Sequence, residues 1–293
     1  MVDAAAVPAV AARPRMALPA MQPARIILFA VLLTFTLIWI SPVVVVLFGA
    51  LKSADEFFQV NGIIAPPLHP DFSNFVSAWT DGNLAHYMLN SLIITTIKVP
   101  LGVFVTSLGA FALSRLRWRF ATPVLVLLLM GMVMPVQAAL IPLESLLARW
   151  GLLNNYASLI AIYIGFGVPF GTLILRGFLV TIPAALDEAA MIVGAGAWER
   201  FVHVIMPLAW PAIASLMIFD SLFTWNEFIF AQLLITDDSM RPAQAGLLAF
   251  SGAYQQQFGA LNAGILITIA PAVIVYLVFQ KRFVSGLAGA VRG

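Results

Sequence analysis

The sequence predicts an all-α membrane protein with six transmembrane helices. Hydrophobic residues make up 62% of its 293 residues and charged residues only 10%, whereas soluble domains have roughly 45–50% and 25%. Six long apolar segments follow one another along the chain, and none shows the alternating pattern of a barrel strand. In hydrocarbon, backbone groups must be hydrogen-bonded within their own segment, so we expect each apolar segment to be helical.

The first apolar segment is an uncharged run of 26 residues, 26–51. A cleavable signal core has about 7–15 residues and a spanning helix needs about 20, so we expect this segment to remain as the first span. Residues 1–25 are rich in Ala and Pro and lack apolar periodicity, which predicts a disordered cytoplasmic tail. The remaining spans are expected at residues 87–113, 121–143, 153–175, 208–235 and 261–280.

The basic residues predict the orientation of the spans, because Lys and Arg collect on the cytoplasmic side. With six spans threaded back and forth, 11 of the 15 basic residues share one side, three lie on the other, and Lys98 is within the second span. We therefore expect both termini in the cytoplasm. The 11 residues are Arg13, Arg15, Arg25, Arg115, Arg117, Arg119, Arg176, Arg200, Lys281, Arg282 and Arg292.

The composition also excludes several classes of function. A net charge of +2 gives no basic surface for nucleic acid, and the absence of cysteine excludes disulfides and thiolate metal sites. The three histidines show no metal-ligand spacing. No phosphate-binding G-x4-G-K-[ST] loop surrounds Lys52, Lys98 or Lys281, and no hydrolase motif is present. We expect a transport protein that binds no cofactor itself, rather than an enzyme.

The cytoplasmic loop between the fourth and fifth spans, residues 177–207, is too long and too polar for a simple turn. Pro183 is placed to begin a helix and Gly194 to end it. A second short helix is expected from about Ala197, stopping before Pro207 because proline interrupts helices. The loop is therefore predicted to carry two short helices.

The first of these helices has a surface suited to a protein partner. Ala189 and Ala190 are small enough for another backbone to approach closely, while Leu186 and Met191 offer apolar contacts. A helix with these residues on its surface is suited to docking on another protein. An amphipathic helix lying on the membrane interface has a similar composition, and the residues alone leave both interpretations open.

The loop resembles the EAA loop of ABC importer permeases, written EAA-x3-G-x9-I-x-L-P. The matching residues are Glu188, Ala189, Ala190, Gly194, Val204, Met206 and Pro207, with Val and Met in place of the usual Ile and Leu. The resemblance implies the type I ABC importer permease fold. It also implies that the helix docks on an ATPase through Glu188, Ala189, Ala190 and Gly194, with Leu186 and Met191 beside them.

Further segments are similar to the carbohydrate-uptake branch of this family, which includes the shorter maltose-type permease. They are residues 51–53, 90–92, 225–228 and 280–287. The resemblance implies import of sugars by alternating access in the bacterial inner membrane. It also implies a second permease, normally a different chain, two ATP-binding subunits that carry ATP and magnesium, and an extracytoplasmic sugar-binding protein.

The resemblance gives a domain organisation of a permease domain over residues 26–283 and a cytoplasmic tail over residues 284–293. Similar permeases use this ending to contact the ATPase. The alternative is a basic tail that binds anionic lipid.

Polar residues within the fifth span suggest a substrate pathway. Asp220 and Glu227 are seven residues apart, so on one helix they share a face, with Thr224 between them. Together with Trp225 and Asn226 they offer the carboxylates, amides and ring faces that sugars need. The alternative is that they bond to neighbouring helices or to the partner permease. A secondary transporter could also use such carboxylates, but six spans are few for one and the EAA loop would have no purpose.

Other intramembrane features are open to two interpretations. Lys98 precedes Pro100 by two residues, so carbonyls freed by a kink are its expected structural partners. Prolines at 135 and 142 are expected to break up the third span, and residues 165–169 the fourth. Irregular helices of this kind either line a cavity or are ordinary kinks.

The last outward loop carries the amides Gln255, Gln256 and Gln257 beside Tyr254, between glycines at 252 and 259. Such a loop can project and supply donors, acceptors and a ring face to a sugar. The resemblance implies that Tyr254, Gln255, Gln256 and Gln257 contact the binding protein. The alternative is a polar cap whose rings lie at the membrane interface.

Overall fold

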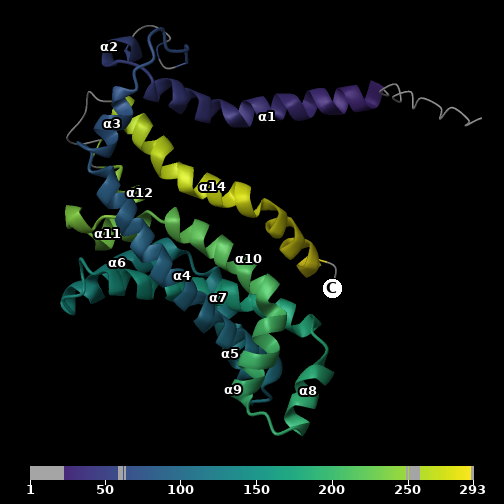
Figure 1. Cartoon of the computed structure of the whole chain (residues 1–293). Coiled ribbons are helices and arrows are strands. Elements are labelled where there is room, and N and C mark those ends of the chain that lie inside the picture. Colours follow the sequence, from purple (N-terminus) through teal and green to yellow (C-terminus); the bar gives the residue numbers. More distant parts are fainter. Residues whose placement is uncertain (1–22, 59–61, 63, 249, 251–257, 292–293) are drawn as a thin grey trace, which may run out of the picture. The chain divides into compact units, whose positions relative to one another are not determined.

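The structure, a computed structural model, describes residues 23–58, 62, 64–248, 250 and 258–291, with side chains as far as residue 280. All the regular elements in these ranges are helical (Figure 1). The all-α fold class predicted from the sequence is thus confirmed. The chain divides into two compact units, Met1–Val45 and Val46–Gly293, which are described separately.

The first unit contains most of helix α1 (Pro23–Ala50), which is 28 residues long. At a rise of 1.5 Å per residue it extends for about 42 Å, more than the roughly 30 Å of a bilayer core. Its apolar side chains are distributed around the whole helix rather than along one stripe. A helix of this kind belongs in lipid or inside a protein bundle, which agrees with a first transmembrane span.

The second unit is built around α4 (Leu84–Arg115), α7 (Tyr156–Thr181) and α10 (Met206–Trp225). Helices α4 and α7 form the most extensive helix pair, and α10 packs against both of them (Figure 1). Helix α14 (Phe258–Val291) packs against α10 and against α3 (Ser73–Trp79). It continues beyond residue 283, where the sequence places the end of the permease domain.

The third predicted span is a sharply bent pair of helices. Helices α5 (Ala121–Val133) and α6 (Val136–Arg149) meet at 94°. Pro135 explains the break, because it lacks an N–H and forces Met134 before it into an extended conformation. The expected second break at Pro142 is wrong, since this residue lies inside α6. Five described helices are long and apolar enough to cross a membrane, and the bent pair counted as one span makes six.

The fourth and fifth spans also differ from the sequence prediction. Helix α7 is continuous through Pro169, so the predicted break-up of the fourth span is wrong. The fifth span ends at Trp225 and is followed, after three residues, by the short helix α11 (Ile229–Leu234). The expectation of one helix over residues 208–235 is therefore wrong, and Glu227 lies in the connection between the two helices.

The loop between the fourth and fifth spans forms α8 (Ala184–Ile192), a short α9 (Ala197–Glu199) and a π-helical segment η1 (Arg200–Ile205) that leads directly into α10. The expected stop before Pro207 is wrong. In η1 the Met206 N–H donates to the Phe201 carbonyl five residues earlier, a wider turn than in an α-helix. We attribute the continuity of the helix to this wider turn, which relieves the contact between the proline ring and the preceding turn.

Hydrogen bonds join the segment after α11 to the turn before α7 and to α4, and we call this region the cap. The Asn154 side-chain oxygen accepts hydrogen bonds from the backbone N–H groups of Thr236 (2.7 Å) and Asp237 (2.8 Å). The Ser239 hydroxyl and backbone N–H donate to Asp237 and lower the pKa of its carboxyl. The Asn90 amide, on α4, donates to the Ser239 carbonyl. Short helices in this unit include α2 (Ala54–Phe57), η2 (Asp238–Met240) and α12 (Ala243–Gly246).

The close contact of α12 with α4 gives a test of this cap. A Cβ atom on Gly246 would lie 2.2 Å from a ring carbon of Tyr87. Tyr87 is buried and its hydroxyl donates to Asp238, so the ring has little freedom to move. Replacing Gly246→Ala should destabilise the protein by about 1–3 kcal/mol, the usual cost of overpacking a core.

Thermal unfolding of the purified protein in detergent measures this effect. Gly177→Ala is the matched control, because a Cβ on Gly177 meets nothing within 4 Å. The control should unfold at an unchanged or slightly higher temperature. Equal unfolding temperatures for the two variants would contradict the packing of α12 on Tyr87.

Candidate functional site

The first candidate site is helix α8, between the fourth and fifth spans, and the turn that ends it. The Gly194 N–H donates to the Met191 carbonyl and the Ala195 N–H to the Ala190 carbonyl, the two bonds of a Schellman motif. Gly194 has a φ of +87°, a left-handed conformation that favours glycine. The sequence prediction that Gly194 ends the helix is confirmed.

Two arginines fix the position of α8, Arg200, which is buried, and Arg115, which is partly buried. Arg200 of η1 donates to Asp187 of α8 at 3.0 Å, and both side chains are almost fully buried. Arg115, in the last turn of α4, donates to the carbonyl of Ile182 at 2.7 Å and also to that of Leu179. These carbonyls lie where α7 ends and α8 begins. These contacts hold α8 against α4, α7 and the start of α10, so α8 is not part of a free loop.

Apolar side chains on this anchored helix are exposed. Ile192 and Val193 are 86% and 83% exposed, and Leu186 and Met191 are about half exposed. Glu188 and Ala189 are exposed as well, and Ala190 is partly buried. The six residues predicted to dock on a partner thus lie on or directly after one short helix. We call the exposed side chains of Leu186, Met191, Ile192 and Val193 the apolar pad.

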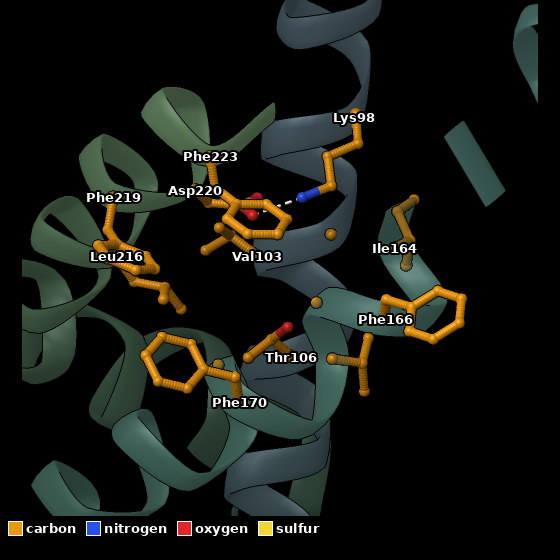
Figure 2. A pocket seen from close by; sticks show the side chains of 14 residues that line it. Lys98, Val103, Thr106, Ile164, Phe166, Phe170, Leu216, Phe219, Asp220 and Phe223 are labelled. Carbon is orange, nitrogen blue, oxygen red and sulfur yellow. Dashed lines mark hydrogen bonds and ion pairs between the residues drawn. The ribbon is translucent and has the colours of Figure 1, made fainter. Parts of the chain in front are cut away.

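The second candidate site is a cavity of about 220 Å³ among α4, α7 and α10 (Figure 2). It lies between two groups of core residues, since Val103 and Leu216 belong to one group and Ile164 and Phe166 to the other. Four phenylalanines surround it. The lining residues are Lys98, Gly102, Val103, Thr106, Ile164, Phe166, Gly167, Val168, Phe170, Gly171, Leu216, Phe219, Asp220 and Phe223.

Lys98 on α4 and Asp220 on α10 form an ion pair at this cavity (Figure 2). The Lys98 side chain is 1% exposed and the Asp220 side chain 15% exposed. The expectation that Lys98 binds carbonyls freed by Pro100 is therefore wrong, since its ammonium donates to a carboxylate 122 residues away. An ionisable residue within a span usually pairs with another or faces a water-filled path.

Two glycines leave room beside this pair. A Cβ on Gly167 would lie 3.5 Å from Lys98 Nζ and 3.8 Å from Asp220 Oδ1, and one on Gly102 would lie 3.7 Å from Asp220 Oδ2. All three distances are ordinary contacts, so the glycines are not required for folding by close approach. They instead place no side chain between the ion pair and the cavity.

The other residues of the predicted pathway have different surroundings. Thr224 donates to the carbonyl of Asp220, and the Trp225 indole N–H donates to the carbonyl of Thr268 on α14. Both are buried and bond to the protein itself. Glu227 accepts hydrogen bonds from the Tyr163 hydroxyl and from two N–H groups that begin α11. Asn226 is exposed. Of the five, Asp220 lines the cavity.

Sequence reasoning did not find the aromatic lining, which comes from α7 and α10, and treated Lys98 as structural. The sequence does indicate part of this aromatic lining, because Phe219 and Phe223 are spaced as neighbours on the helix face that carries Asp220. The glycines of residues 165–169 were interpreted as a helix break. The predicted contact at Tyr254–Gln257 lies outside the described residues, so it stays a prediction.

A bundle of membrane-spanning helices with a polar pair in a cavity among its spans is the architecture of a membrane transport protein. The family model described as "Binding-protein-dependent transport system inner membrane component" matches residues 98–288. The chain belongs to this family, and it is a permease subunit of an ABC importer with several membrane-spanning helices.

Similar proteins include the probable ABC transporter permease protein YurM of Bacillus subtilis, 34% identical and covering 91% of this chain and 86% of that protein. The diacetylchitobiose uptake system permease protein NgcG of Streptomyces coelicolor is also 34% identical, covering 88% and 86%. The trehalose/maltose transport system permease protein MalG of Thermococcus litoralis is 33% identical, covering 91% and 94%. A chain of a bacterial ABC transporter for import of the acidic polysaccharide alginate aligns with a TM-score of 0.77 at 25% identity, covering 91% and 100%.

The buried pair of Asp187 and Arg200 gives a test of the docking helix. Asp187→Asn leaves a buried guanidinium without its carboxylate, which costs about 3–5 kcal/mol in comparable pairs. The double variant Asp187→Leu with Arg200→Met removes both charges and should regain most of that stability. Thermal unfolding of the single and double variants checks this, and additive losses in the double variant would show that the two side chains do not interact.

Proposed function

We propose that this chain forms half of the translocation pathway of a sugar or oligosaccharide importer, driven by an ATPase on separate subunits. The observation that supports this most directly is the apolar pad on α8, held in place by Asp187, Arg200 and Arg115. An anchored helix with an exposed apolar end transmits movement if a partner subunit binds it. A helix resting on lipid would need no such anchoring.

The names of related proteins support sugars as the substrate class. The relatives similar to this chain include permeases for diacetylchitobiose and for trehalose and maltose, and the structural relative imports alginate. Four different saccharides are named for these proteins, which supports a class of substrate rather than one compound. The cavity, with its ring faces and one polar pair, is compatible with that class.

The partner subunits follow from the same proposal. Two ATP-binding subunits supply ATP hydrolysis with magnesium, and α8 docks on one of them from the cytoplasmic side. This orientation places both termini in the cytoplasm. A second permease packs against the exposed apolar side chains that follow α10, Phe228 and Ile229. An extracytoplasmic binding protein delivers the sugar at the opposite end, where Tyr254 to Gln257 are predicted to contact it.

The docking proposal is best tested at Ile192. Its side chain is 86% exposed and makes little contact within the chain, so a change there reports on a partner rather than on folding. Gly194 is less suitable, because its left-handed conformation strains any side chain placed there. Replacing Ile192→Asp should reduce ATP-driven sugar uptake at least about tenfold by placing a charge in an apolar contact.

Uptake and ATP hydrolysis are measured in proteoliposomes that contain the assembled complex. Thr181→Asp is the control, because Thr181 is also exposed but precedes α8. The control should keep its uptake. Normal uptake by the Ile192→Asp complex would contradict docking through the pad. Uptake driven by an ion gradient without ATP would instead identify a secondary transporter.

A further inference from the structure

We propose that the cavity at Lys98 and Asp220 is a binding site for one ring of a neutral sugar during transport. The proposal rests on the proposed function and adds to it which subunit holds the sugar, where, and which class of sugar fits. Four observations support it: the size of the cavity, its ring faces, the unused hydrogen-bonding capacity of the ion pair, and its balance of charge.

The size of the cavity fits a small part of a substrate. Its volume of about 220 Å³ is below the roughly 300–1,000 Å³ of pockets that enclose drug-sized ligands. A single sugar ring is smaller than such ligands, whereas an oligosaccharide exceeds the space. We therefore infer that a longer sugar places one ring here at a time.

The walls offer surfaces for the apolar face of a sugar ring. The rings of Phe170 and Phe219 are tilted by 36° with their centroids 5.3 Å apart, and Phe166 lies on the other side of the cavity in Figure 2. Phe219 and Phe223 are both more than a third exposed, so their faces are available. A sugar ring presents C–H groups on its faces and hydroxyls at its edge, which suits aromatic walls around a small polar centre.

The polar centre has hydrogen-bonding capacity that the protein leaves unused. An ammonium group has three donors, and a carboxylate has about four acceptor positions. Among the described residues, Asp220 is the hydrogen-bond partner of Lys98 Nζ, and Asp220 Oδ2 accepts no hydrogen bond. Sugar hydroxyls both donate and accept, so one ring edge can bond to both groups without separating them.

The charge of the site favours a neutral sugar. Of the described residues that line the cavity, Lys98 and Asp220 alone are ionisable, and their charges cancel. A uronate carboxylate would meet no uncompensated cation here and would lie close to Asp220. In a site of low dielectric that repulsion is poorly screened. We therefore expect discrimination against acidic sugars at this point of the pathway.

The alternative is that the ion pair only holds α4 and α10 together. Removing one charge cannot separate the two interpretations, because a lone buried charge is destabilising in either case. Two variants can do so. Gly167→Ala keeps the ion pair and places a methyl group about where a hydroxyl of the bound sugar would lie. The double change Lys98→Met with Asp220→Leu keeps the volume of the two side chains and removes their polarity.

Gly167→Ala has a matched control on the same helix. A Cβ on Gly165 meets nothing within 4 Å, and Gly165 does not line the cavity. The assembled complex is trapped with vanadate and its binding protein in nanodiscs, and the retained radiolabelled sugar is counted. The probe is the best-transported member of a panel of neutral glucose, galactose and N-acetylglucosamine oligosaccharides and of oligouronates.

The expected result is that a neutral sugar is the best substrate and that Gly167→Ala retains about tenfold less of it, whereas Gly165→Ala retains the normal amount. The complex with the double change Lys98→Met and Asp220→Leu should also retain less of the sugar, by a factor of about ten or more. Its ATPase activity should still be stimulated by the binding protein. If that double variant does not assemble, Gly167→Ala decides between the interpretations.

Normal sugar retention and uptake in Gly167→Ala would overturn the site, and so would normal values in the double variant. Preference for an oligouronate would overturn the inferred substrate class. Failure of the unmodified complex to transport either class would instead contradict the proposed function. These outcomes distinguish an error in the site from an error in the function.

Discussion

An ammonium and a carboxylate buried together among membrane-spanning helices impose the constraint on which the rest of this structure depends. Neither charge is tolerated alone in a membrane span, so Lys98 and Asp220 require α4 and α10 to meet at one point. Helix α7 lies against both helices, and its Gly167 places no side chain between the ion pair and the cavity. The cavity is lined by this polar pair, by aromatic side chains and by glycines next to the pair.

The same three helices connect this cavity with the docking helix. Helix α4 carries Lys98 and, in its last turn, Arg115, whose guanidinium binds carbonyls at the end of α7. From Ala197 the chain runs as one helix of 29 residues through Arg200 to Trp225. Asp220 lies near the end of that helix, and α8 is bound to its start through Asp187. A displacement of α8 by a partner therefore acts on the elements that surround the cavity.

Local patterns predicted the helical segments, the kink at Pro135 and the glycine turn at Gly194, because apolar runs, prolines and left-handed glycines act on their immediate neighbours. Tertiary contacts were not predictable in this way. The partner of Lys98 is 122 residues away. The end of α10 before Glu227 depends on contacts of that carboxylate with Tyr163 and with the start of α11. Such pairings leave no periodic signal in the sequence.

We propose that α8 faces the cytoplasm and binds an ATPase there. Since the chain has no cysteine, Val193→Cys creates a single thiol at a position that is 83% exposed. Labelling with a membrane-impermeant maleimide in right-side-out and inside-out vesicles tests the claim. We expect labelling in inside-out vesicles alone, and protection of the thiol there when the ATPase subunits are assembled. Labelling from the outside, or equal labelling with and without the ATPase, would contradict it.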